Sequence, residues 1–240
     1  MCWVWCNTMP DINRRKLLKS IGAAAGASAF GLGTAQAKTD DQSTNEDILL
    51  TFDPENQKEV RKAYRQLSSL PNKRAVEKII EKLSHAQVTA LREVNKHTEV
   101  VTVLEASDGT QYQVSGDDES VGVKQAESLV SISSVGDNTV TAVSKLKNWA
   151  GTTEATFKHH VYWEYDGTNV MKESHWHEAS TAVLYDFDGV STNYLDNRGD
   201  EAVSRKIADF SSCLGGPCVT KQLGTEIWMF ENGGWTVNEL

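Results

Sequence analysis

Between residues 53 and 97 the apolar positions recur every three or four residues, which is the period of an amphipathic helix. Asp53-Pro54-Glu55 has the composition of a helix N-terminus, with a capping Asp and a Pro at the first helical position. A second apolar stripe runs from Val76 to Leu83, and Ser84-His85-Ala86-Gln87 has the form of a capping box that begins a third helix. The pattern predicts a helical region over residues 53–97.

After His97 the pattern changes to an alternation of apolar and polar residues, which is typical of half-buried strands. Turn sequences separate the runs, and we expect hairpins at Asp108-Gly109, at Gly136-Asp137-Asn138 and at Asp166-Gly167. Further short strands are expected over residues 182–187, 219–223, 227–230 and 235–237. Because no helical crossovers intervene, residues 98–240 are expected to form an antiparallel sandwich or barrel, and the fold class is α+β.

The first 37 residues have the order of parts found in an export signal. Arg14 and Arg15 precede a short Gly/Ala-rich run, and Ala35-Gln36-Ala37 supplies a small-residue cleavage site. The paired arginines resemble twin-arginine signals, which implies a twin-arginine translocase and a signal peptidase as export partners. The run is too short for a membrane anchor, so we expect a secreted or cell-envelope protein that starts at Met1 or Met9.

Charge narrows the range of partners. Residues 38–240 contain 20 Lys and Arg against 32 Asp and Glu, a balance that repels nucleic acid and anionic lipid. The stretch 38–52 begins with a polar, acidic run and is expected to be a disordered leader. With an acidic chain behind a twin-arginine signal, this protein resembles uncharacterised secreted proteins of halophilic archaea, some of which are precursors of antimicrobial proteins.

Histidines near the Asp166-Gly167 turn are the strongest candidates for chemistry. If a connection of two or four residues joins the two strands, His160, His175 and His177 share one face of the hairpin. Three neutral imidazoles leave a fourth tetrahedral position on zinc for water, which would suit a hydrolase or lyase. The alternative is that this face is the ordinary solvated side of a hairpin, while His159, on the other face, packs in the core.

The His-x-His strand with a third His on its neighbour is similar to the metal site of alpha-type carbonic anhydrases and, more loosely, of cupins. That resemblance implies a zinc cofactor held by His160, His175 and His177. It extends over these residues alone. Motifs for common serine hydrolases, phosphate-binding loops and dinucleotide sites do not occur after residue 37.

Two further residue groups bear on function. Cys213 and Cys218 flank Leu-Gly-Gly-Pro, and an exported chain is expected to join them in a disulfide. Tryptophans of the β region either fill the core or form a platform on which a sugar stacks; they are Trp149, Trp163, Trp176, Trp228 and Trp235.

Three hypotheses on function follow from the sequence. The first is an exported binding or interaction protein, the second is a zinc enzyme that uses the three histidines, and the third is a secreted antimicrobial precursor. In the third, residues 38 to roughly 100 would be a leader that is removed.

Overall fold

A computed structural model describes residues 49–106, 111–114 and 135–240, which belong to one compact unit, Asp40–Leu240. The predicted signal, with Arg14, Arg15, Ala35 and Ala37, lies outside the described residues, as does most of the predicted leader. The last four residues of that leader are described, and the prediction that they are disordered is wrong, because residues 49–51 are helical and Leu49 and Phe52 are buried in a hydrophobic cluster with the helices that follow. The described chain is an α+β structure in which helices precede a β-rich part, as the sequence predicts.

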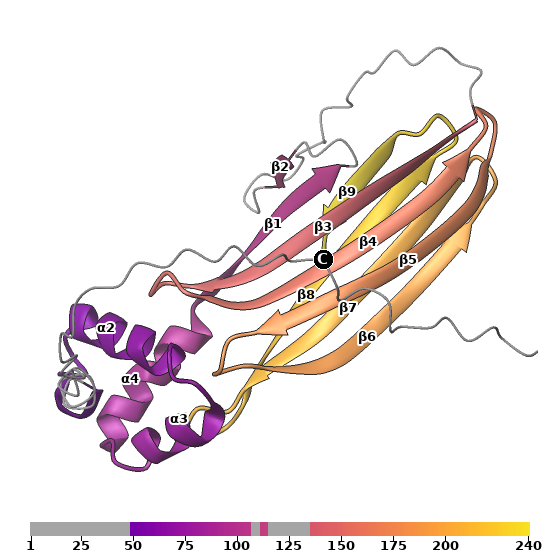
Figure 1. Cartoon of the computed structure of the whole chain (residues 1–240). Coiled ribbons are helices and arrows are strands. Elements are labelled where there is room, and N and C mark those ends of the chain that lie inside the picture. The colour runs from indigo at the N-terminus through magenta and orange to yellow at the C-terminus, as the bar shows by residue number, and fades with distance from the viewer. Residues whose placement is uncertain (1–48, 107–110, 115–134) are drawn as a thin grey trace, which may run out of the picture. The chain divides into compact units, whose positions relative to one another are not determined.

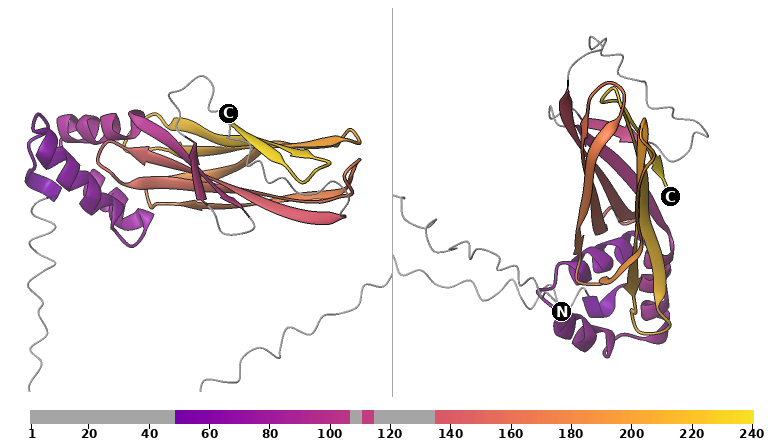
Figure 2. Two further views of the ribbon diagram at one scale, coloured as in Figure 1. Left: turned by 90° about the horizontal axis from the view of Figure 1, so that it is seen from above. Right: turned by 90° about the vertical axis from the view of Figure 1, so that its right-hand side faces the viewer.

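Two antiparallel sheets face each other as two layers (Figures 1 and 2). The first sheet has the order β2-β1-β3-β4-β5 and the second the order β6-β7-β8-β9. The architecture is therefore a sandwich. The elements are α2 (Gln57–Ser68), α3 (Lys73–Ile80), α4 (His85–Lys96), β1 (Thr98–Ala106), β2 (Gln111–Val114), β3 (Gly136–Asn148), β4 (Thr153–Tyr165), β5 (Val170–Thr181), β6 (Asp186–Asn197), β7 (Glu201–Ser212), β8 (Val219–Phe230) and β9 (Trp235–Glu239).

The helices begin where side chains satisfy their free backbone N–H groups. Ser84 and Gln87 form the predicted capping box of α4. The cap of α2 is Asn56, whose side chain accepts a hydrogen bond from the backbone N–H of Lys58, so the prediction that Asp53 caps this helix is wrong.

Several strands differ from their predicted bounds. Gly136-Asp137-Asn138 begins β3 and is not a hairpin turn, and residues 129–134 lie outside the described chain. The predicted strand over residues 182–187 is mostly a turn that leads into β6. Two long strands, β6 and β7, were not predicted, and residues 219–230 form one strand where two were expected.

The helices and one end of the sandwich share a hydrophobic core. Leu67 of α2 and Leu91 of α4 lie in the same buried cluster as Phe157 of β4 and Phe210 of β7. A hydrogen bond of 2.8 Å from Asn95 Nδ2 of α4 to the Ser212 hydroxyl also joins the helices to the second sheet. The helical region therefore folds against the strands, so that its removal would expose their apolar side chains to water.

A second hydrophobic cluster lies farther along the strands, and buried polar side chains separate it from the first. On β4, for example, His159 lies between Phe157 of the first cluster and Val161 of the second. We call the separating residues the polar layer: Thr102, Ser144, His159, Ser204, Lys206 and Thr225. All six are buried, and they come from both sheets.

Candidate functional site

The three histidines predicted to bind zinc do not share a face. The turn is as short as expected, since Tyr165 pairs with Val170, but Glu164 pairs with Lys172, so Met171 forms a β-bulge. One extra residue reverses the face of everything that follows it. His160 therefore pairs with Trp176 on the outer face, whereas His175 pairs with Val161 on the inner face, and the predicted three-histidine zinc site is wrong.

On the outer face His160 is bound to its neighbours. Its ring stacks on Trp176 with centroids 5.0 Å apart, and its Nδ1 lies 2.8 Å from the Thr141 hydroxyl. His177, paired with His159, instead contacts the rings of Phe157 and Phe187. Across residues 49–106, 111–114 and 135–240, no group of three His, Cys, Asp or Glu side chains is placed to hold a metal ion.

His159 and His175 meet at one hydroxyl group of the polar layer. The Ser204 Oγ lies 2.7 Å from His159 Nε2 and 2.7 Å from His175 Nδ1, while His159 Nδ1 lies 2.9 Å from Thr225 Oγ1. Burial, together with the nearby cation of Lys206, lowers the pKa of His159 to about 3 and that of His175 to about 4. Both rings are therefore neutral at pH 7.

A serine beside a neutral histidine is the pairing used in nucleophilic catalysis. Ser204 is 0% exposed, however, and a substrate cannot reach its hydroxyl in this conformation. The arrangement instead satisfies the polar atoms of an interior layer. The prediction that His159 is a packed core histidine is confirmed.

A hollow of about 330 Å³ lies on the outer face of the second sheet. Strand pairing places Tyr194, Arg205, Glu226 and Asn238 in one row across β6, β7, β8 and β9. The next row contains Asp196, Val203, Trp228 and Thr236. Directly paired residues share a face, so the two rows form a continuous surface that the hollow occupies.

Apolar and aromatic residues line the hollow together with charged ones. Val203 is only 2% exposed although it lies on the outer face, because the side chains around it cover it. Tyr194 is 45% exposed, and Trp228 is half-buried. These are the features of a ligand site: apolar surface to exclude water, with a few polar groups at fixed positions.

Glu226 is the best-held polar group of the hollow. Its carboxylate accepts hydrogen bonds from Arg205 Nε at 2.8 Å, from the indole N–H of Trp228 at 2.8 Å and from Asn238 Nδ2 at 3.4 Å. Burial alone would raise the pKa of Glu226, but these hydrogen bonds outweigh burial and lower it. The carboxylate is therefore ionised and fixed in direction.

Arg198 also lines the hollow. Its guanidinium carbon lies 5.1 Å from the ring centroid of Trp228, and its nitrogens contact Asp196 at 3.0 Å and Glu201 at 3.1 Å. Each charge of the hollow thus has an opposite charge as its neighbour. A ligand with a net charge would have to compete with these pairs, whereas a neutral polar ligand would not.

The five tryptophans of the β region differ in their burial and in the residues that they contact. Trp163 is fully buried, Trp235 packs against the second cluster, and Trp149 lies under the guanidinium of Arg61. Trp176 is exposed on the first sheet, and Trp228 alone among the five lines the hollow. Sequence reasoning missed the lining residues of β6 and β7 because these strands were not predicted, and it missed Glu226 because this residue lies between the two short strands predicted over 219–223 and 227–230. The signal that could have revealed β6 and β7 is a spacing of two residues, which places Thr192 with Tyr194 on one face of a strand, and Val203 with Arg205 on one face of the next.

Cys213 and Cys218 form the predicted disulfide in the connection between β7 and β8. Beside it, Leu214 is buried in the first cluster, and Arg92 of α4 donates a hydrogen bond of 3.3 Å to the carbonyl of Pro217. The short loop thereby holds the helices against the second sheet.

No protein-family model, curated protein or solved structure matches this chain. Among the residues that the structure describes, no helix is both long enough and apolar enough to cross a bilayer.

Proposed function

We propose that this protein is an extracytoplasmic binding protein whose ligand is a neutral carbohydrate held in the hollow of the second sheet. The observation that carries the proposal is the combination of exposed Tyr194, half-buried Trp228 and a fixed Arg205–Glu226 pair in one hollow. Each part has a counterpart in the chemistry of a sugar.

A pyranose ring has an apolar face of C–H groups and an edge of hydroxyl groups. The C–H face stacks on an aromatic ring, because both are apolar and the electron-rich face of the ring attracts the C–H hydrogens. Hydroxyl groups both donate and accept, so they pair with a carboxylate and a guanidinium at once. Tyr194 can supply the stacking surface, while Glu226 and Arg205 can supply the two kinds of polar partner.

Retention on insoluble polysaccharides tests the proposal. We expect the protein to be retained on at least one of microcrystalline cellulose, chitin and xylan, and to bind a soluble oligosaccharide of the same sugar in calorimetry. Removing one stacked aromatic ring by Tyr194→Ala should weaken that binding by up to about tenfold. Trp228→Ala should weaken it as well.

Trp176→Ala is the matched control, because Trp176 is also an exposed aromatic residue of a strand but lies on the first sheet. Its binding should equal that of the wild type. The proposal is wrong if none of the three polysaccharides retains the protein, or if Tyr194→Ala and Trp228→Ala bind as well as Trp176→Ala.

Location outside the cytoplasm is part of the proposal. It is supported by the paired Arg14 and Arg15 ahead of a Gly/Ala-rich run and by the disulfide, which persists in an oxidising compartment. Replacing both arginines by lysine keeps the charge but removes the pair that the translocase reads. An uncleaved precursor should then accumulate in the cytoplasm, and normal export of this variant would contradict a twin-arginine route.

The shared core argues against a helical leader that is released to leave an active β domain. Leu67 and Leu91 pack with Phe157 and Phe210, so cleavage near residue 100 followed by separation would expose a large apolar area. We therefore infer that the helices and strands act together.

A further inference from the structure

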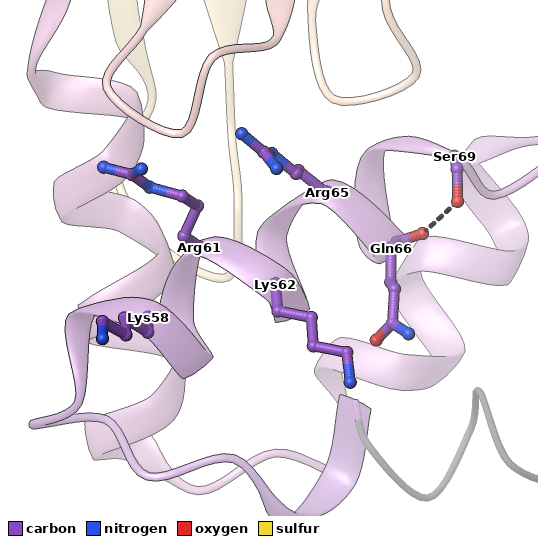
Figure 3. A pocket seen from close by; sticks show the side chains of 6 residues that line it. All are labelled: Lys58, Arg61, Lys62, Arg65, Gln66 and Ser69. Carbon is purple, nitrogen blue, oxygen red and sulfur yellow. Dashed lines mark hydrogen bonds between the residues drawn. The ribbon is translucent and has the colours of Figure 1, made fainter.

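We propose that the exposed side of α2 is a second binding surface, independent of the sheet hollow, and that it takes an acidic polysaccharide. Lys58, Arg61, Lys62 and Arg65 lie at intervals of three and four residues along this helix and, with Gln66 and Ser69, line a shallow hollow of about 350 Å³ (Figure 3). We call these four cations the α2 cationic stripe.

The stripe is a local excess of positive charge on an acidic chain. Residues 53–97 contain ten Lys and Arg against six Asp and Glu, whereas residues 98–240 contain nine against 22. Within the described residues, none of the four cations lies within 4 Å of a carboxylate. Like charges four residues apart destabilise a helix, so the stripe costs stability that neighbouring acids do not offset.

Two of the four cations have fixed directions. The guanidinium of Arg61 lies 5.4 Å from the ring centroid of Trp149, and Arg65 Nε donates a hydrogen bond of 2.7 Å to the carbonyl of Ala150. In Figure 3 these two side chains extend toward the strands, while Lys62 and Gln66 extend to the other side of the helix. The cations are therefore spread across a band and do not converge on one point.

A spread of this kind fits a chain of anions better than a single small anion. From residue 58 to residue 65 the helix rises about 10 Å. A polysaccharide with one carboxylate on each sugar can lie along the band and meet several cations, and the arginine fork matches the two oxygens of a carboxylate.

Two other anionic partners fit less well. A membrane-binding helix inserts an apolar face into lipid, but the apolar residues of α2, including Val60, Tyr64 and Leu67, are fully buried in the protein. Duplex DNA carries one negative charge per about 1.7 Å, and the acidic β region would repel so dense an array.

The test uses sodium alginate, a polyuronate, with neutral dextran as the control ligand. We expect the full chain to bind alginate at low salt and not dextran. Lys58→Gln/Lys62→Gln should weaken alginate binding by about tenfold and should reduce the slope of log affinity against log salt by about one to two. Neither lysine side chain has a hydrogen bond or ion pair with any described residue, so the variant should fold normally.

Arg74→Gln/Lys78→Gln removes the same charge from the exposed side of α3 and is the matched control. We expect this control variant to bind alginate with the affinity of the wild type. The inference fails if alginate does not bind, if both double variants lose affinity equally, or if duplex DNA or phosphatidylglycerol vesicles bind through the stripe more tightly than alginate. Tyr194→Ala tests binding of cellulose, chitin and xylan in the sheet hollow only. The two proposals are therefore tested independently of each other.

Discussion

The hydroxyl oxygen of Ser204 on β7 lies 2.7 Å from Nε2 of His159 on β4, which joins the two sheets through a polar contact in the interior. The same oxygen is 2.7 Å from Nδ1 of His175, so a single hydroxyl serves two buried or partly buried imidazoles. Polar groups in an interior stabilise the fold only while each has its partner.

Ser204→Ala is expected to destabilise the protein more than its small change in volume suggests. The substitution leaves a nitrogen of each imidazole without its partner, at a cost of about 2 to 3 kcal/mol in the free energy of unfolding. Urea denaturation at pH 7.5 measures this change. Ser180→Ala, on the exposed part of β5, serves as the control and should change stability by less than about 0.5 kcal/mol. Equal stability of the two variants would show that the Ser204 contacts contribute nothing.

The buried histidines predict a loss of stability in acid. The pKa of His159 is lowered to about 3 in the folded protein, whereas an exposed histidine of the unfolded chain titrates near 6.5. Below pH 6.5 the unfolded state binds more protons, so this contribution is fully present above pH 6.5 and is lost as the pH falls toward 3. Unfolding midpoints between pH 7.5 and pH 4 should therefore decrease.

His159→Gln separates this effect from general acid denaturation. The variant has no titratable group at the position, so it should lose less stability than the wild type between pH 7.5 and pH 4, on the order of 3 kcal/mol less. His97→Gln is the control, because the side chain of His97 is 74% exposed. Parallel pH profiles for the wild type and His159→Gln would contradict the prediction.

The buried Glu154 should change the pH dependence of stability in the opposite direction to His159. Its side chain is 0% exposed, and burial raises its pKa despite hydrogen bonds that include one of 2.7 Å from Asn148 Nδ2. The folded state therefore holds the proton more tightly than the unfolded state, and the charged form is unfavourable at neutral pH. Glu154→Gln should raise the free energy of unfolding at pH 7.5 by about 1 kcal/mol, and the gain should shrink as the pH falls toward 4.

Glu99→Gln removes the same charge at an exposed position of β1 and should leave stability within about 0.5 kcal/mol of the wild type at both pH values. A loss of stability in Glu154→Gln at pH 7.5 would mean that the carboxylate is needed in its charged form for the hydrogen bonds around it.

Local signals in the sequence were sufficient for several elements. The capping box at Ser84 begins α4, the alternation on both sides of Asp166-Gly167 produces the β4 and β5 hairpin, and Cys213 bonds to Cys218. Each of these depends on residues that are close together along the chain, so propensity and spacing predict that the element exists, although the register of the hairpin was not predicted.

The polar layer explains why β7 was missed. A half-buried strand is recognised by apolar residues at every second position, but the inner face of β7 carries Ser204 and Lys206 where that rule expects apolar side chains. Their burial depends on partners in distant strands: Ser204 on His159 and Lys206 on Asn193. No pattern within β7 reveals those partners.

By itself, then, the sequence determined where α4 begins, that the segments on both sides of Asp166-Gly167 are strands, and which cysteines pair, because these properties follow from neighbours in the chain. Only the tertiary structure decided that Met171 bulges and sends His175 inward, and that Tyr194, Arg205 and Glu226 meet in one row across three strands. The physical reason is that the face on which a strand residue lies has a period of two. A single extra residue in the pairing therefore reverses it, and only contacts between strands fix that pairing.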